Sequence, residues 1–145
     1  MRSITWQVIT TLVINRQRQY SQTMNNQPLI GIVGPCGAGK STLATGLVQL
    51  GYSVRHIAQE HSYVPTMWHR ITKPDILIYL DVSYLNTLKR RSLDWTVEEY
   101  KEQLYRLRHA HQHADFYLDT NPLDQREVLG AVLSWLLTKF PSVVG

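Results

Sequence analysis

The chain has 145 residues and a formal net charge of +4 at pH 7. With 43% hydrophobic and 18% charged residues, it is expected to form one globular domain with a substantial core. The single cysteine excludes an internal disulfide and favours a reducing, cytoplasmic compartment. The basic balance is mild, and aromatic residues do not interleave with basic ones in any recognised module, so we predict no nucleic-acid partner.

The first 27 residues differ in composition from the rest of the chain. Residues 4–14, ITWQVITTLVI, are apolar but too short to span a bilayer, and a polar stretch follows them, so we predict no membrane partner. Three interpretations of residues 1–27 stay open. They are an annotation artefact upstream of a start at Met24, a disordered tail, or a short strand or helix packed on the domain. The predicted domain covers residues 28–145.

Apolar runs and capping patterns predict alternating strands and helices. The predicted strands are Leu29–Val33, Tyr52–Ala58, Asp75–Val82 and Asp115–Thr120. The predicted helices cover residues 40–50, 83–91 and 97–111 and a segment after Asp124, while residues 60–74 are assigned to a loop with a short helix. This order predicts an α/β fold of three layers, αβα, with helices on both faces of a short, mostly parallel sheet of about four strands.

A glycine-rich segment follows the first predicted strand and reads GPCGAGKSTL. Residues 34–41 match the phosphate-loop pattern G-x-x-x-x-G-K-[ST] in full, between a strand and a helix as the pattern requires. The glycines allow successive backbone N–H groups to point at phosphate oxygens, and the helix N-terminus adds a positive dipole end. The predicted nucleotide site consists of Gly34, Pro35, Cys36, Gly37, Ala38, Gly39, Lys40, Ser41 and Thr42.

The residues of this loop have different expected roles. Lys40 is expected to contact the β- and γ-phosphates, Ser41 to bind Mg²⁺, and Thr42 to lie near the α-phosphate. Cys36 has two interpretations: a thiol made reactive by the helix N-terminus and Lys40, or a small side chain that fills space.

From Pro28 to about Leu137, the chain resembles the P-loop small-molecule kinases of the P-loop NTPase superfamily, such as nucleoside, nucleotide and shikimate-type kinases. The stretches that carry the resemblance are PLIGIVGPCGAGKSTLATGL, KPDILIYLDVSYLNTLKRR and ADFYLDTNPLDQREVLGAVLSWL. The second is similar to a strand, turn, helix and arginine cluster of thymidylate and deoxynucleoside kinases. The resemblance implies a P-loop NTPase fold, ATP and Mg²⁺ as cofactors, and phosphoryl transfer to a small molecule.

The resemblance also implies residues outside the loop. Arg90 and Arg91 match the position of arginines that close over ATP, with Arg106 and Arg108 as further candidates. The alternative for each is a solvated basic helix face. Asp81, at the end of a predicted strand, is interpreted as strand-end or helix-capping structure rather than as a metal ligand.

Glu60 is the candidate acid of the site. It matches a residue that accepts a substrate hydroxyl proton or orients a magnesium-bound water, the alternative being a solvated loop glutamate. By the same resemblance, Trp68 is expected to face a bound ring. His56 and His61 flank the predicted site without an assigned role.

The sequence departs from this family in one region. Relatives carry a further strand with Asp-Arg or Glu-Arg, whereas about sixteen residues separate Ala58 from Asp75 here. Two functions therefore stay open: an ATP-dependent kinase of an unidentified small acceptor, and a nucleotide-binding module or slow NTPase that acts through a partner. The choice of ATP or GTP and the oligomeric state are also open.

Overall fold

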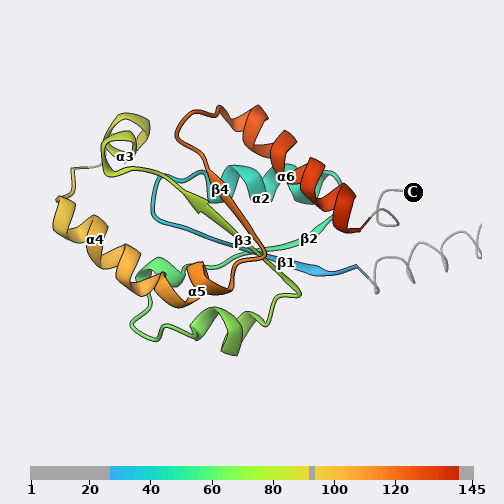
Figure 1. Cartoon of the computed structure of the whole chain (residues 1–145), viewed down its shortest axis with the longest axis horizontal. Helices are drawn as coiled ribbons and strands as arrows, with labels where there is room; N and C mark the ends of the chain where they lie inside the picture. The colour runs from blue at the N-terminus through green and yellow to red at the C-terminus, as the bar shows by residue number, and fades with distance from the viewer. Residues whose placement is uncertain (1–26, 92–93, 141–145) are drawn as a thin grey trace, which may run out of the picture.

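A computed structural model describes residues 27–91 and 94–140. Four parallel strands form one sheet in the order β2-β1-β3-β4 (Figure 1). Their bounds are Leu29–Val33 for β1, Ser53–His56 for β2, Ile76–Asp81 for β3 and Phe116–Asp119 for β4. The predicted α/β class and short parallel sheet are confirmed. The predicted N-terminal extension lies outside the described residues, apart from Gln27.

Helices cover both faces of the sheet (Figure 1). α2 (Lys40–Gln49) and α6 (Gln125–Lys139) pack against one face, on a core that includes Ile32, Ile78 and Leu80. The other face is covered by the π-helix η2 (Trp68–Thr72), α4 (Val97–Arg106) and α5 (Arg108–His113), over a second core that includes Leu77 and Tyr79. Neighbouring residues of a strand point to opposite faces, so a sheet covered twice needs continuous apolar runs.

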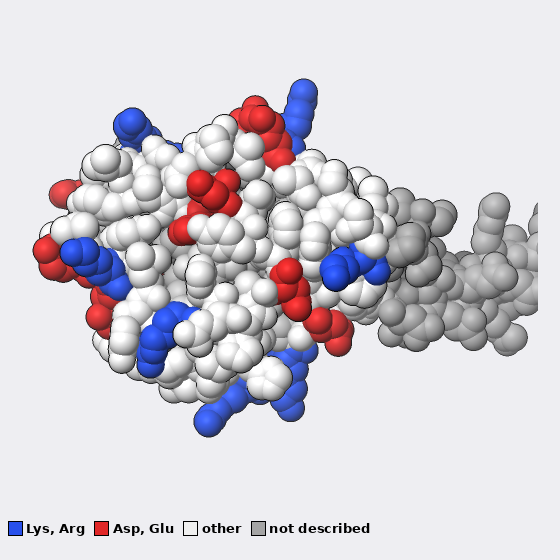
Figure 2. Space-filling model, viewed as in Figure 1, with Lys and Arg blue, Asp and Glu red and all other residues white. Residues whose placement is uncertain are grey.

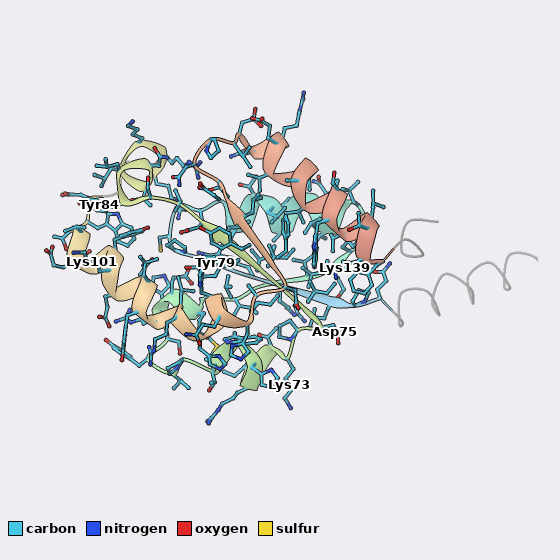
Figure 3. All side chains as sticks on the ribbon, in the orientation of Figure 1. Lys73, Asp75, Tyr79, Tyr84, Lys101 and Lys139 are labelled. Atoms are coloured by element: carbon cyan, nitrogen blue, oxygen red, sulfur yellow. The ribbon has the colours of Figure 1, made fainter. Side chains whose placement is uncertain are left out.

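The carboxyl ends of the strands lead into the loops and helices that matter for the site. The loop after β1 leads into α2, η1 (Gln59–His61) follows β2, and α3 (Tyr84–Arg91) follows β3. Tyr84, the first residue of α3, is labelled in Figure 3, and its hydroxyl donates to the carbonyl of Trp95, just before α4, at 2.6 Å. Ligands on sheets of this kind bind at these carboxyl ends.

Local capping explains where the last helix begins. Asp124 accepts a hydrogen bond from the Glu127 backbone N–H at 2.8 Å, and Glu127 accepts one from the Asp124 N–H at 3.1 Å. This capping box is the one that the sequence predicts. At the start of α4, Thr96 accepts from the Glu99 N–H at 3.2 Å.

Two predicted elements differ from the structure by more than one residue at an end. The helix predicted over 97–111 breaks at Leu107, which ends α4 and precedes α5. Leu107 and Ala110 are both 0% exposed and pack on the sheet face beside Trp68. α5 lies against β3. The second predicted strand, 52–58, is also too long, since β2 covers Ser53–His56.

The charges of the visible face are mixed. In Figure 2, lysine and arginine side chains alternate with aspartate and glutamate, without a large area of one sign.

Within residues 27–91 and 94–140, no helix combines the length and apolar character that crossing a bilayer requires.

Gly34, at the end of β1, leaves no room for a side chain. A Cβ placed there would lie 2.1 Å from the Leu80 carbonyl oxygen, and its φ is 152°. We therefore expect Gly34→Ala to destabilise the fold by roughly 3 kcal/mol or more, because the opposing atom is backbone and cannot rotate away. Urea unfolding followed by circular dichroism measures this cost.

The matched control is Gly130→Ala within α6. A Cβ at Gly130 meets nothing within 4 Å, so the same substitution should stabilise the protein by roughly 0.5–1 kcal/mol. Equal unfolding midpoints for the two variants would contradict the close approach of β1 to β3.

Candidate functional site

A cavity of about 640 Å³ opens beside the amino end of α2. It is lined by Cys36, Gly37, Ala38, Gly39, Lys40, Ser41, Thr42, His56, Ala58, Glu60, His61, Arg90, Arg91, Leu123, Asp124, Gln125 and Val128. The structure thus brings together the predicted loop, the predicted acid and both predicted arginines. Gly34 and Pro35 are buried and do not line the cavity, but their carbonyl groups contact Lys40.

The loop between β1 and α2 presents free backbone donors to this cavity. Gly37 and Gly39 have φ values of 86° and 94°, which L-residues with side chains rarely adopt. The N–H groups of Gly37, Gly39, Lys40, Ser41 and Thr42 find no acceptor among the described residues. At a helix N-terminus, such donors and the helix dipole favour an anion.

Lys40 is a buried cation held by three partners. Its side chain is 5% exposed. Its Nζ donates to the carbonyl oxygens of Gly34 at 2.5 Å and Pro35 at 3.1 Å, and it forms an ion pair with the Glu60 carboxylate. A buried charge is tolerated when it is paired and hydrogen-bonded in this way. The cavity wall therefore carries a buried ion pair next to the free amides.

The two carboxylate oxygens of Glu60 differ in their contacts. The residue is 2% exposed, its Oε2 pairs with Lys40, and its Oε1 has no hydrogen-bond partner among the described residues. A buried, unsatisfied carboxylate oxygen costs free energy and commonly marks a functional position. The interpretation of Glu60 as a solvated loop glutamate is therefore wrong.

Gln59 fixes the segment that carries Glu60. Its side chain is 0% exposed, and its Nε2 donates to the carbonyls of Val64 at 2.9 Å and Arg106 at 3.2 Å. Its Oε1 accepts from the Trp68 N–H at 2.9 Å. We call this set of contacts the Gln59 clamp. The sequence offers no signal for it, because a loop glutamine is ordinarily solvated.

Arg90 connects three segments at the cavity edge. Its guanidinium donates to the Thr120 hydroxyl at 2.9 Å and to the Thr120 carbonyl at 2.5 Å, and it lies 3.4 Å from the Gly37 carbonyl. Arg90 therefore joins α3 to the end of β4 and to the loop after β1. Arg91 is exposed and also lines the cavity.

Several other predicted residues lie elsewhere. Arg106 donates to the Glu60 carbonyl at 3.3 Å and Arg108 to the Tyr105 carbonyl at 2.7 Å, and neither lines the cavity. Asp81 accepts from the Val82 N–H at 2.9 Å and does not line the cavity either, as expected for strand-end structure.

The expectation that Trp68 faces a bound ring is wrong. Trp68 is 6% exposed, belongs to the core beneath η2, and donates from its indole nitrogen to His109 Nδ1 at 3.1 Å. The neighbouring His69 is exposed and does not line the cavity. The indole packs inward because it completes the apolar face that Leu107 and Ala110 cover.

Two histidines and Cys36 complete the wall. Ser41 Oγ lies 3.4 Å from His56 Nδ1, and burial lowers the pKa of His56, an effect that the nearby Lys40 charge strengthens. The Cys36 sulfur lies 3.6 Å from His61 Nε2. Gln103, a residue that the sequence did not single out, holds Cys36 by accepting from its N–H at 3.0 Å.

A comparison of the chain with models of known protein families finds no match, and no curated protein matches it significantly. The geometry of the cavity therefore carries the functional interpretation.

The Gln59 clamp predicts a stability effect. Gln59→Ala would leave the Trp68 N–H and two carbonyls buried without this partner, so we expect a loss of roughly 1–3 kcal/mol in the free energy of unfolding. The matched control is Gln112→Ala on the exposed surface of α5, which should stay within about 0.5 kcal/mol of the parent. Equal losses in thermal or urea unfolding would contradict the clamp.

Proposed function

We propose that the protein binds Mg-ATP at the loop of residues 34–42 and transfers its terminal phosphoryl group to a small-molecule acceptor. The observation that carries this proposal is the combination of free amides with a buried ammonium. The amides of Gly37 and Gly39 and of the first residues of α2 lack acceptors in the described part of the chain, beside the Lys40 side chain. Such a cradle is suited to a polyphosphate. The cavity of about 640 Å³ lies within the usual range for small-molecule sites.

The residues around the cradle fit the proposed metal and phosphate groups. Ser41 is exposed at the start of α2, where its hydroxyl would bind Mg²⁺. When bound, Mg²⁺ would neutralise charge on the phosphates. Lys40 would exchange partners among its three present acceptors for the β- and γ-phosphate oxygens, while Arg90 and Arg91 would stabilise charge on the transferred group.

In the proposed transfer, one bond to the γ-phosphorus forms and another breaks. An acceptor oxygen forms a bond to the γ-phosphorus while the bond from that phosphorus to the β–γ bridging oxygen breaks. The proton of the acceptor hydroxyl moves to the Glu60 carboxylate. The Oε1 atom of Glu60, which has no partner among residues 27–91 and 94–140, is suited to this role because Oε2 already pairs with Lys40.

A cytoplasmic location belongs to the same proposal, since a reducing compartment keeps the Cys36 thiol free.

A second function is favoured by the short segment between β2 and β3. This segment, residues 57–75, holds only η1 and η2, and Trp68 packs away from the cavity. An acceptor would therefore meet a small set of side chains, mainly Glu60, His61 and His56. The alternative proposal is a nucleotide-binding module or slow NTPase that acts through a partner.

Product analysis with ATP labelled at its γ-phosphate separates the two functions. Transfer of label to a member of a nucleoside and sugar panel supports the kinase, and slow release of labelled phosphate supports the NTPase. ATP binding with neither product supports the binding module. Under the kinase proposal, Glu60→Gln that is folded by near-ultraviolet circular dichroism should still bind Mg-ATP and lose transfer.

Removal of the Lys40 charge tests nucleotide binding. Lys40→Met alone would leave Glu60 buried and unpaired, which typically costs about 3–5 kcal/mol, so it is combined with Glu60→Gln. We expect the double variant to bind Mg-ATP roughly 10- to 100-fold more weakly, since it lacks hydrogen bonds from a charged donor. Isothermal titration calorimetry measures this change.

Two controls accompany this measurement. Lys101→Met on α4, labelled in Figure 3, removes an exposed lysine and should leave the affinity unchanged. Glu60→Gln alone is the background for this comparison: it leaves the buried Lys40 charge without its carboxylate, so its folding is checked by circular dichroism, and it should bind Mg-ATP more tightly than the double variant. Unchanged affinity in the Lys40→Met/Glu60→Gln protein would refute the assignment of Lys40 to the phosphates.

A further inference from the structure

A cluster of three different metal-binding side chains lies on one wall of the cavity. The Cys36 sulfur, a carboxylate oxygen of Glu60 and a ring nitrogen of His61 all lie within 4.8 Å of one another. Cys36 belongs to the loop after β1, while Glu60 and His61 are neighbours in η1. The cluster therefore forms where the loop after β1 meets η1, and no sequence motif predicts it.

The separation of the Cys36 sulfur and the His61 nitrogen suits a tetrahedral ion. Zinc bonds of about 2.3 Å to sulfur and about 2.0–2.1 Å to imidazole nitrogen place the two ligand atoms about 3.5 Å apart in a tetrahedral site. The Cys36 sulfur lies 3.6 Å from His61 Nε2. This pair is therefore already at the spacing that a shared zinc ion would require.

The cluster contains an acceptor that no protein group satisfies. Glu60 is 2% exposed, and its Oε1 has no hydrogen-bond partner among the described residues. A bound cation would satisfy that oxygen. Lys40 already pairs with the other oxygen, so the carboxylate has one position left for a metal.

Gln103 holds the sulfur in place for such a role. Its amide oxygen accepts from the Cys36 N–H at 3.0 Å, and its Nε2 donates to the Cys36 sulfur at 3.2 Å. Gln103 is 7% exposed, so this contact is protected from water. Outer contacts of this kind orient a metal ligand.

We propose that Cys36, Glu60 and His61 form a zinc site with an open fourth position toward the cavity. A thiolate with an imidazole selects zinc over Mg²⁺, which prefers oxygen ligands and octahedral geometry. Three protein ligands with one open position are the arrangement in which zinc keeps an exchangeable water. The site shares Cys36 and Glu60 with the proposed nucleotide site, and a zinc-bound Glu60 would not act as the base, so zinc binding is tested in the absence of nucleotide.

Cobalt titration tests the site with a spectroscopic signal. The full-length, reduced protein is titrated with Co²⁺ in the absence of nucleotide, and Zn²⁺ is then added. We expect one equivalent of Co²⁺ to give thiolate-to-cobalt charge-transfer absorption together with strong visible bands of a tetrahedral ion. Zn²⁺ should abolish both signals. Absence of the charge-transfer absorption would overturn the proposal.

Variants assign the ligands. Cys36→Ser should lose the charge-transfer absorption, and His61→Ala should weaken Co²⁺ binding by more than the roughly 10- to 100-fold typical of outer contacts. Gln103→Ala should weaken it within that range, as a positioning residue. His69→Ala is the matched control, since His69 is exposed and lies outside the cavity. Equal spectra and affinities for the two histidine variants would overturn the site.

Further variants separate this proposal from the nucleotide site. Ser41→Ala should leave the cobalt spectrum unchanged while weakening Mg-ATP binding. Glu60→Gln should weaken Co²⁺ binding, with near-ultraviolet circular dichroism as the check that it folds. If it does not fold, the His61→Ala variant still tests the site, because His61 is exposed and its substitution should not disturb folding. A protein that binds Co²⁺ through Cys36 and His61 but gives no heat with Mg-ATP would refute the nucleotide proposal and leave the zinc site standing.

Discussion

The burial of one ammonium group organises the whole cavity. Lys40 is 5% exposed, and its charge is held by the carbonyls of Gly34 and Pro35 and by the Glu60 carboxylate. Those partners come from the loop after β1 and from η1, so a single cation ties together two segments on neighbouring strands. A buried pair is costly to form and costly to break, because either partner left alone is an uncompensated charge. The loop, α2 and η1 are therefore held in one arrangement.

The features that the sequence predicts well are local ones. The bounds of β1 match the prediction, because Leu29–Val33 is a continuous apolar run at a position buried on both faces. The capping box of Asp124 and Glu127 is encoded within four consecutive residues. The glycine-rich pattern likewise places the turn before α2 at the right residues. Each of these signals depends on neighbours in the chain and needs no knowledge of the fold.

The features that the sequence misses depend on distant partners. Gln59 accepts from Trp68 but donates to the carbonyl of Arg106, which is 47 residues away. Gln103 contacts Cys36 across 67 residues. Glutamine has no periodic or capping signature in such positions, so its role becomes visible only when the fold brings the segments together. The inward orientation of Trp68 has the same cause, since the core that it fills is assembled from separate elements.

The Gln59 clamp also limits the flexibility of the cavity wall. The segment between β2 and β3 is short, and it is tied through one side chain to Val64, Trp68 and the end of α4. A stretch anchored in this way loses little conformational entropy on binding, so the wall beside Glu60 is pre-organised. Selectivity at that wall would come from shape complementarity with a rigid surface. Molecules of a different shape would clash with the wall, because it would not rearrange to fit them.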